Sequence, residues 1–438
     1  MNERSYPSDS ESHALDDNLV LRTACTLADV ERIAVFNATV HSDEEVAAYT
    51  RWKLAGGHPE IRLSDAVLVE DKATGKIVSS LCSFPQTWLY EGVALPVREI
   101  ALVGTDAVYR KRGLIRAQMR YVHSQMRAGG SLLGCIEGIP GFYRQFGYEF
   151  AVPLGSCARL SQEKLPIGGS SPMGSLRVRP IDLDRDLPAV IRLYQQSASQ
   201  LQVLADRSQA LWQYLEAAPP GVPDRQETWV VESGRGVVAY VRLRKNMWGP
   251  WLELAEMCVE TLLSSSDRAA VYEATLHSAR STAVERAYQG LCFALDPRHE
   301  LLEEIEKLGP EPERQYAWQV KVIDAVELLK RIAPVLERRL VESDSRECSR
   351  VLDINLMSRV IRLTLEQGRV AGVVWLSDRV KSECELRLSE HQFVQLVLGY
   401  RDYATLMDSS LDAWVHPGIR DLVGILFPRL RSFVNGAN

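Results

Sequence analysis

The segment best suited to chemistry is a basic, glycine-containing turn between an apolar strand and a helix. Residues 99–117 read EIALVGTDAVYRKRGLIRA, so three basic side chains at 110–112 precede Gly113 and the expected helix. The first turn of a helix has unpaired backbone N–H groups and the positive end of its dipole, and both attract phosphate. Glycine lets a phosphate approach the backbone closely. The segment therefore predicts a pyrophosphate-binding turn, with an ordinary basic surface turn as the alternative.

An aromatic segment further along the chain supplies a candidate proton donor. Residues 141–149 read GFYRQFGYE and follow an expected strand and a Gly-Ile-Pro turn. A tyrosine side chain has a pKa of about 10, so at neutral pH the phenol of Tyr143 can donate its proton to a developing anion. Packing on a cofactor or in the core is the alternative role for Tyr143. Tyr148 is interpreted as structural.

Apolar periodicity predicts the elements that position these two segments. Helical periodicity covers about 27–40 and about 113–127, and strand-like runs occupy 66–70, 76–84 and 97–105. Helices that alternate with strands in this order predict a mixed, mostly antiparallel sheet with helices on its faces. The expected fold class is therefore α/β, of the α+β kind.

The region after residue 175 repeats the pattern of the first region. Arg22 stands seven residues before Asp29, which opens an amphipathic helix, and Arg179 has the same spacing to Asp186. At the same offset the strand segments REIAL and AEMCV coincide, so a duplicated α/β unit is expected. Chance similarity of amphipathic helices is the alternative for any single match. The second copy has TLLSSSD in place of the basic turn, which predicts a degenerate unit that shapes the substrate cleft.

The basic turn and the aromatic segment together resemble the GNAT acetyltransferase superfamily. In that family R/Q-x-x-G-x-G/A binds the pyrophosphate of acetyl-CoA, and a later FY-x-x-x-G-[YF] segment closes the site. Here the first motif reads RKRGLI, so Ile115 stands where the family has Gly or Ala. The resemblance implies acetyl-CoA as co-substrate and Tyr143 as the acid that protonates the departing thiolate. It implies these cofactor-binding residues: Val103 and Thr105 beside the pantetheine arm, and Arg110, Lys111, Arg112, Gly113, Leu114 and Ile115 around the pyrophosphate.

The last hundred residues have a different character. Strands at 360–365 and 369–375 are joined by a Glu-Gln-Gly turn, and a capping box at 389–392 opens a helix. Two GNAT-like units followed by a small α+β domain resemble the enhanced intracellular survival (Eis) acetyltransferases, which implies a homo-oligomer, with a hexamer as the state that the family suggests. The expected domains are a disordered tail (1–17), a catalytic GNAT domain (18–160), a linker (161–175), a degenerate second GNAT-like domain (176–321) and a sterol-carrier-protein-like domain (322–438).

The group that accepts the proton of the amine is left open by the sequence. The Eis resemblance implies the terminal carboxylate, which here belongs to Asn438 after the polar end FVNGAN. Glu99 is the rival, because some GNAT enzymes place a glutamate base on the strand before the turn. A structural role for Glu99 and a chain of waters as the base are further alternatives.

Composition restricts the classes of partner. The formal net charge of -6 over 438 residues gives no bulk attraction for nucleic acid or anionic lipid. The eight cysteines form no CxxC pair and the histidines no HExxH motif, so no metal site is expected. No apolar run approaches the ~18 residues that span a bilayer, and residues 1–17 do not resemble a signal peptide. A soluble, cytoplasmic protein without nucleic-acid or membrane partners is expected.

The two motifs and the family resemblance together imply an enzyme that transfers an acetyl group from acetyl-CoA to a primary amine by direct attack in a ternary complex. Aminoglycoside-like polyamines, lysine side chains and biosynthetic amines are the candidate acceptors. A run of acidic side chains at 43–45 could attract a cationic amine, although such runs are often only solvated. The alternative is a non-catalytic scaffold that binds acyl-CoA or a lipid.

Overall fold

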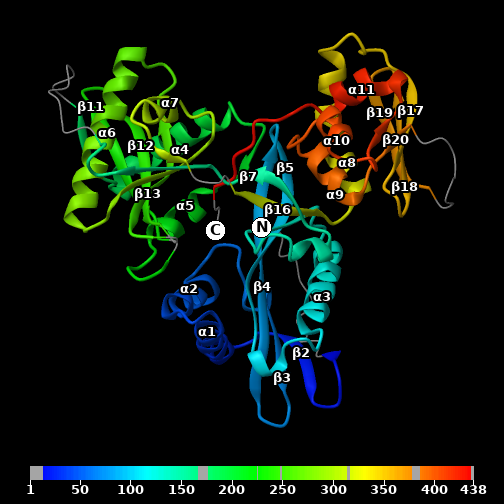
Figure 1. Ribbon diagram of the computed structural model, residues 1–438, viewed down its shortest axis with the longest axis horizontal. Helices are drawn as coiled ribbons and strands as arrows, with labels where there is room; N and C mark the ends of the chain where they lie inside the picture. Colours follow the sequence, from blue (N-terminus) through cyan, green and yellow to red (C-terminus); the bar gives the residue numbers. More distant parts are fainter. Residues whose placement is uncertain are drawn as a thin grey trace.

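The strands of the described residues form three sheets, of nine, seven and five strands (Figure 1). Most neighbouring strands are antiparallel, and helices cover the sheets. This mixed α/β architecture confirms the predicted fold class. The computed structural model describes residues 13–165, 176–223, 225–246, 249–312, 316–376 and 385–435.

The first sheet carries the two segments singled out in the sequence. Its strand order is β1-β2-β3-β4-β5-β6-β16-β7, and β10 pairs with β4. The strands are β1 (His13–Ala14), β2 (Leu19–Thr23), β3 (Ala66–Asp71), β4 (Lys76–Tyr90), β5 (Val93–Thr105), β6 (Leu133–Ile136), β7 (Glu149–Pro153), β10 (Val203–Ala205) and β16 (Ala317–Val322). The associated helices are α1 (Leu27–His41), α2 (Glu44–Ala55), η1 (Leu63–Asp65), η2 (Ala107–Tyr109), α3 (Leu114–Ala128) and η3 (Tyr143–Phe146).

Both faces of this sheet are buried under helices. Successive side chains of a strand point to opposite faces, so neighbouring residues of β3 belong to different apolar clusters. Val67 and Val69 of β3 belong to the apolar cluster that contains Met119 of α3. Leu68 lies in the cluster formed with Ile33 of α1. The helices α1 and α3 therefore lie on opposite sides of the long strands β4 and β5, as Figure 1 shows.

The second and third sheets follow along the chain. The second consists of β8 (Ser156–Ser161), β9 (Arg177–Pro180), β11 (Glu227–Ser233), β12 (Gly236–Lys245), β13 (Trp251–Val259), β14 (Gly290–Leu295) and β15 (Glu311–Pro312), with α4 (Leu183–Ala198), α5 (Gln209–Glu216), α6 (Ser265–Glu285) and α7 (Glu300–Glu306). The third consists of β17 (Arg350–Asn355), β18 (Val360–Glu366), β19 (Arg369–Trp375), β20 (Leu386–Arg387) and β21 (Trp414–Val415), with α8 (Ala325–Val341), α9 (Glu390–Val397), α10 (Tyr403–Ser409), η4 (Pro417–Ile419) and α11 (Arg420–Leu426).

The first and second sheets exchange strands. β8 follows β7 directly in sequence, yet it pairs with β14 of the second sheet. β16 comes from beyond the second sheet and lies between β6 and β7 of the first. The domain boundaries expected after residues 160 and 321 therefore fall inside these two strands.

The third sheet shares a core with the first. One apolar cluster contains Trp88 and Leu133 of the first sheet, Leu329 and Ile332 of α8, and Leu363 of β18. The buried phenol of Tyr90 also donates a hydrogen bond to the carbonyl of Val397 at the end of α9, at 2.8 Å. These contacts fix the end of α9 beside the first sheet.

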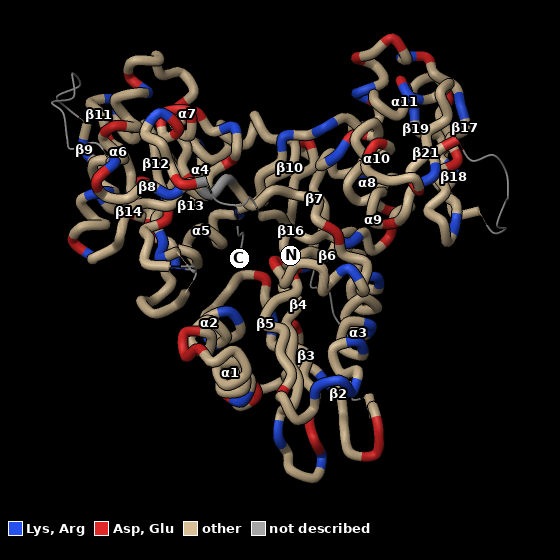
Figure 2. Tube along the Cα trace, in the orientation of Figure 1, with Lys and Arg blue, Asp and Glu red and all other residues tan. Residues whose placement is uncertain are grey.

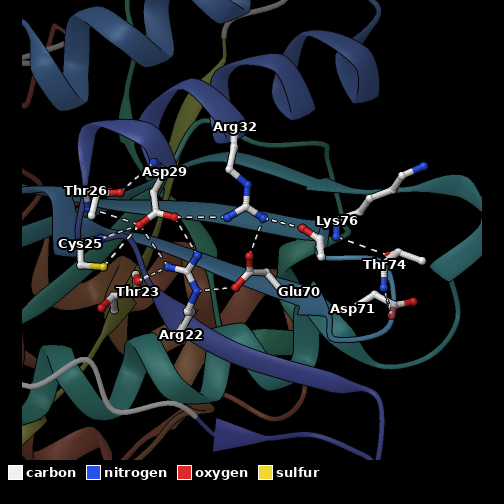
Figure 3. A network of polar contacts seen from close by, with 11 residues as sticks. Arg22, Thr23, Cys25, Thr26, Asp29, Arg32, Glu70, Asp71, Thr74 and Lys76 are labelled. Carbon is white, nitrogen blue, oxygen red and sulfur yellow. Dashed lines mark hydrogen bonds and ion pairs between the residues drawn. The ribbon is translucent and has the colours of Figure 1, made fainter.

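An ionic network joins β2, α1 and β3 at one end of the first sheet (Figure 3). Arg22 donates to Asp29 at 2.7 Å and also binds Glu70, which in turn accepts from Arg32. Burial opposes ionisation of Asp29, but hydrogen bonds from Arg22 and from the backbone N–H of Cys25 outweigh it and hold the pKa of Asp29 well below its usual range.

The second sheet carries the same network. Arg179 of β9 donates to Asp186 at 3.0 Å and to Glu232 of β11 at 2.9 Å. Arg179 and Asp186 are seven residues apart, as Arg22 and Asp29 are. In both networks the arginine also binds a glutamate from the neighbouring strand, Glu232 or Glu70.

Candidate active site

The strands β5 and β6 diverge within the first sheet and leave an unpaired strand edge. They pair in parallel only from Val97 to Glu99 of β5. Beyond Glu99, the register between β5 and β4 shifts, and Leu102 has a positive φ of 53°. The edge of β5 from there to Thr105 faces no strand among the described residues. Its backbone groups can therefore pair with an extended ligand.

The basic turn follows this edge and leads into α3. Gly113 is the N-cap residue, with a φ of 76°, and the first backbone hydrogen bond of the helix runs from Ala117 to its carbonyl. A Cβ on Gly113 would meet no atom within 4 Å, so the backbone conformation and not crowding favours glycine here. The backbone N–H groups of the first turn, from Leu114 to Arg116, have no partner within the helix.

The N-terminus of α3 differs from those of the other long helices. No side chain caps it, and its first turn contains no acidic residue. Every other α-helix of eight or more residues in the described part of the chain has a side-chain N-cap. The free donors and the uncompensated dipole of α3 together favour an anion at this position.

The three basic side chains of the turn are exposed around this helix end. Arg110 donates to the carbonyl of Thr105 at 3.3 Å, and Arg112 forms a 2.9 Å ion pair with Asp16. Lys111 lies between them with a φ of 64°. All three can therefore add positive charge near the free N–H groups without a burial cost.

Tyr143 lies in the same apolar cluster as the start of α3. It is 5% exposed and is clustered with Ile100 and Leu114, and Val103 and Ile115 pack against this cluster. Burial, with Tyr316 close by, raises the pKa of Tyr143 to about 12. The structure thus brings Tyr143, the predicted acid, together with Val103, Leu114 and Ile115 of the predicted cofactor-binding residues, and burial favours the protonated phenol.

Tyr316, directly before β16, and Gln319 of β16 hold the loop that precedes Tyr143. Tyr316 and Gln319 both donate to the carbonyl of Gly138, the latter at 2.7 Å. A Cβ on Gly138 would lie 2.3 Å from the ring of Tyr143, so this glycine is required for the ring to pack on the loop. Neither Tyr316 nor Gln319 was predictable as part of the site, because both lie at a strand that follows the entire second sheet in sequence.

Glu99 lies where β5 and β6 separate. It is the last residue of β5 that pairs with β6, and its Oε2 accepts a 2.6 Å hydrogen bond from Nε2 of Gln86. Gln86 in turn accepts from the indole N–H of Trp88 at 2.8 Å. The carboxylate is therefore fixed in orientation at the head of the divergence.

The C-terminal segment 431–435 lies between the first two sheets. The N–H of Phe433 donates to Val203 at 2.9 Å, and the indole of Trp318 donates to the carbonyl of Val434 at 2.8 Å. Asn435 reaches the other sheet and donates to the carbonyl of Ala255 on β13 at 2.7 Å. Asn438, whose carboxylate is a candidate base, lies outside the described residues.

The second sheet has no equivalent anion site at the matching helix. The start of α6 is capped by the Ser264 side chain, which accepts from the N–H of Asp267 at 3.1 Å. Within the described ranges no three His, Cys, Asp or Glu side chains gather as metal ligands do. Among those ranges, too, no helix has the length and apolar character to cross a membrane.

Residues 24–151 match the family model of the acetyltransferase (GNAT) domain. This range contains the diverging strands, the basic turn and Tyr143. These residues form a GNAT acetyltransferase domain. A domain of this family makes the protein an acyl-CoA-dependent N-acyltransferase, so its general activity is acyl transfer. No curated protein matches the sequence significantly.

Solved structures share the fold over nearly the whole chain. A GCN5-related N-acetyltransferase from Anabaena variabilis is 14% identical with a TM-score of 0.68, and Eis1 from Mycobacterium abscessus is 13% identical with a TM-score of 0.60. Each match covers 95% of this chain and 99% of the other. N-myristoyltransferase from Saccharomyces cerevisiae with bound myristoyl-CoA is 12% identical with a TM-score of 0.52, over 73% of this chain and 86% of that one.

Proposed function

We propose that the protein transfers an acetyl group from acetyl-CoA to a primary amine by direct attack of the amine. The uncapped N-terminus of α3 beside the unpaired edge of β5 is the observation that carries this proposal. The pyrophosphate binds the free N–H groups from Leu114 to Arg116, with Arg110, Lys111 and Arg112 around it. The pantetheine arm extends the sheet along Val103 and Thr105.

The thioester then lies where β5 and β6 separate after Glu99, near Tyr143. Direct attack by a neutral amine forms a C–N bond, and collapse of the tetrahedral intermediate breaks the C–S bond and releases a thiolate. Tyr143 donates its proton to that sulfur, and a base takes the proton of the amine. A polyamine, a lysine side chain or a biosynthetic amine is the proposed acceptor.

We further propose that the first two sheets are tandem GNAT units and that the third belongs to a sterol-carrier-like domain. The repeated ionic networks support the duplication, and so does the strand–helix–strand order β13-α6-β14, which matches β5-α3-β6. Assembly and site closure are the proposed roles of the last domain. A homo-oligomer and a cytoplasmic location remain predictions of the sequence.

Acetyl-CoA-dependent release of free thiol tests the proposed function. We expect the purified protein to release CoA with at least one amine from a panel of polyamines, aminoglycosides and lysine peptides, and the product to gain the mass of one acetyl group. The same assay with propionyl- and myristoyl-CoA measures the preference for the acyl chain. Absence of release with every amine, together with no binding of CoA in calorimetry, would leave a scaffold that binds a different apolar ligand.

Two variants distinguish the candidate bases. If Glu99 accepts the proton, Glu99→Gln will lower kcat/KM at neutral pH by about a hundredfold, the lower range for general-base catalysis. If the Asn438 carboxylate accepts it, one glycine added after Asn438 will have that effect, because it moves the carboxylate by about 3.5 Å. If kcat/KM falls in neither variant at any pH, a chain of waters is favoured as the group that accepts the proton.

A further inference from the structure

A groove of about 680 Å³ separates α3 from η3 and the start of α9. One wall is a helical face of α3 with Arg116 and Arg120 one turn apart. The opposite wall brings Arg144 from η3, Lys321 from β16 and His391 from α9. Figure 2 shows that Lys and Arg recur along α3, although the chain as a whole is acidic. Three parts of the chain that are far apart in sequence thus form one basic groove.

Only part of the positive charge of the groove is compensated. Arg144 forms a 2.7 Å ion pair with Glu149, and Arg116 donates to Gln145 at 3.2 Å. Among the described lining residues only Glu390 is acidic, and neither Arg120 nor Lys321 has an ion-pair or hydrogen-bond partner in the described part of the chain. Burial lowers the pKa of Lys321, and the charges of Arg127 and Arg359 lower it further against the opposing effect of Glu390. A half-buried ammonium in this environment would be stabilised by an anion.

Lys321 and His391 provide hydrogen-bond donors for such an anion. A Cβ on Gly147 would lie 2.4 Å from the Nζ atom of Lys321 and would displace the ammonium from the end of η3, and the φ of 88° at Gly147 also favours glycine. The Nε2 atom of His391 is buried without a hydrogen-bond partner among the described residues. His391 is among the residues that line the groove together with Lys321.

We propose that this groove is a second phosphate-binding site, formed jointly by the GNAT domain, β16 and α9. A phosphate dianion accepts several charge-assisted hydrogen bonds at once, and it matches the Lys321 ammonium, the Arg120 guanidinium and the His391 ring. The groove begins at Arg116, in the first turn of α3. The phosphate is therefore either the 3′-phosphate of the CoA donor, which rests on the proposed function, or free inorganic phosphate.

Binding of CoA and of 3′-dephospho-CoA tests the site without an acceptor and in phosphate-free buffer. We expect the wild-type protein to bind CoA about tenfold more tightly than 3′-dephospho-CoA, as a charged hydrogen bond would give. In the Lys321→Met variant the two ligands should bind alike, at the weaker affinity. The matched control is Lys307→Met on an exposed lysine of the second sheet region, which should behave like the wild type.

Inorganic phosphate separates the two sources. If CoA and 3′-dephospho-CoA bind alike but phosphate raises the Tm of the wild type and not that of Lys321→Met, the groove binds free phosphate. If neither the 3′-phosphate nor inorganic phosphate distinguishes the wild type from Lys321→Met, no phosphate binds in the groove and the proposal is overturned. Failure of both CoA ligands to bind, with stabilisation by phosphate still present, would contradict the proposed function and leave this site in place.

Discussion

Replacing Tyr143 with phenylalanine should lower kcat by about a hundredfold and leave the Kd of acetyl-CoA nearly unchanged. The ring remains to pack on Gly138 and the apolar cluster, so the substitution removes only the phenol proton. Because burial raises the pKa of Tyr143 to about 12, the wild-type phenol stays protonated through neutral and mildly alkaline pH. We therefore expect no decline of kcat from this group below about pH 10. Steady-state kinetics from pH 6 to 10 measures both effects.

Tyr148 provides the matched control. It is fully buried in the same cluster, and its phenol shares a 3.0 Å hydrogen bond with Nε2 of His123. Tyr148→Phe should reduce stability by about 1 kcal/mol, as for one lost hydrogen bond, and should keep kcat within a few-fold of the wild type. Equal losses of kcat in the two variants, or a normal kcat in Tyr143→Phe, would assign the role of acid to another group.

Replacing Arg207 with methionine should destabilise the protein by about 3–5 kcal/mol, because it leaves a buried carboxylate without its partner. Arg207 and Glu256 form a 2.8 Å ion pair in which the side chains are 0% and 5% exposed. The guanidinium also stacks on Tyr194 and Trp212, with 4.7 and 4.8 Å from Cζ to the ring centroids. Burial opposes ionisation of Glu256, but Arg207 outweighs it and lowers its pKa. Tm and urea denaturation measure the loss.

Two companion variants make this prediction specific. The double variant with Arg207→Met and Glu256→Gln should recover part of the loss, because no unpaired charge is then buried. Arg51→Met, which breaks an exposed ion pair with Glu31, should change the free energy of unfolding by less than about 1 kcal/mol. A destabilisation of Arg207→Met no larger than that of Arg51→Met would mean that the buried pair contributes little.

The parts of the site that were predictable are those encoded over short distances. A strand, a basic run, a glycine and a helix are contiguous in sequence, so their arrangement follows from local geometry, and Gly113 is the N-cap of α3. The capping box at Ser389 was predictable for the same reason and is confirmed at the start of α9. The long β4–β5 hairpin was underestimated, because both strands continue to the turn at Glu91.

The parts that were not predictable depend on contacts between distant segments. Nothing in the sequence around Tyr316 or Gln319 indicates that they bind the loop before Tyr143, since β16 could equally have paired with its own sheet. The same holds for Lys321, which reaches the groove only because β16 lies between β6 and β7. Pairing between distant strands is decided by the packing of the complete core and not by local propensity.

The exchange of β8 and β16 also affects the order in which the chain can mature during translation. β6 and β7 are not neighbours, so the first sheet stays open until β16 has been synthesised and has paired with both. A nascent chain that ends before Val322 thus exposes two strand edges, and the loop at Gly138 lacks the donors that hold it. The loop before Tyr143 therefore acquires its donors only after about three quarters of the chain has been synthesised, when β14 and β15, the partners of β8, are also present.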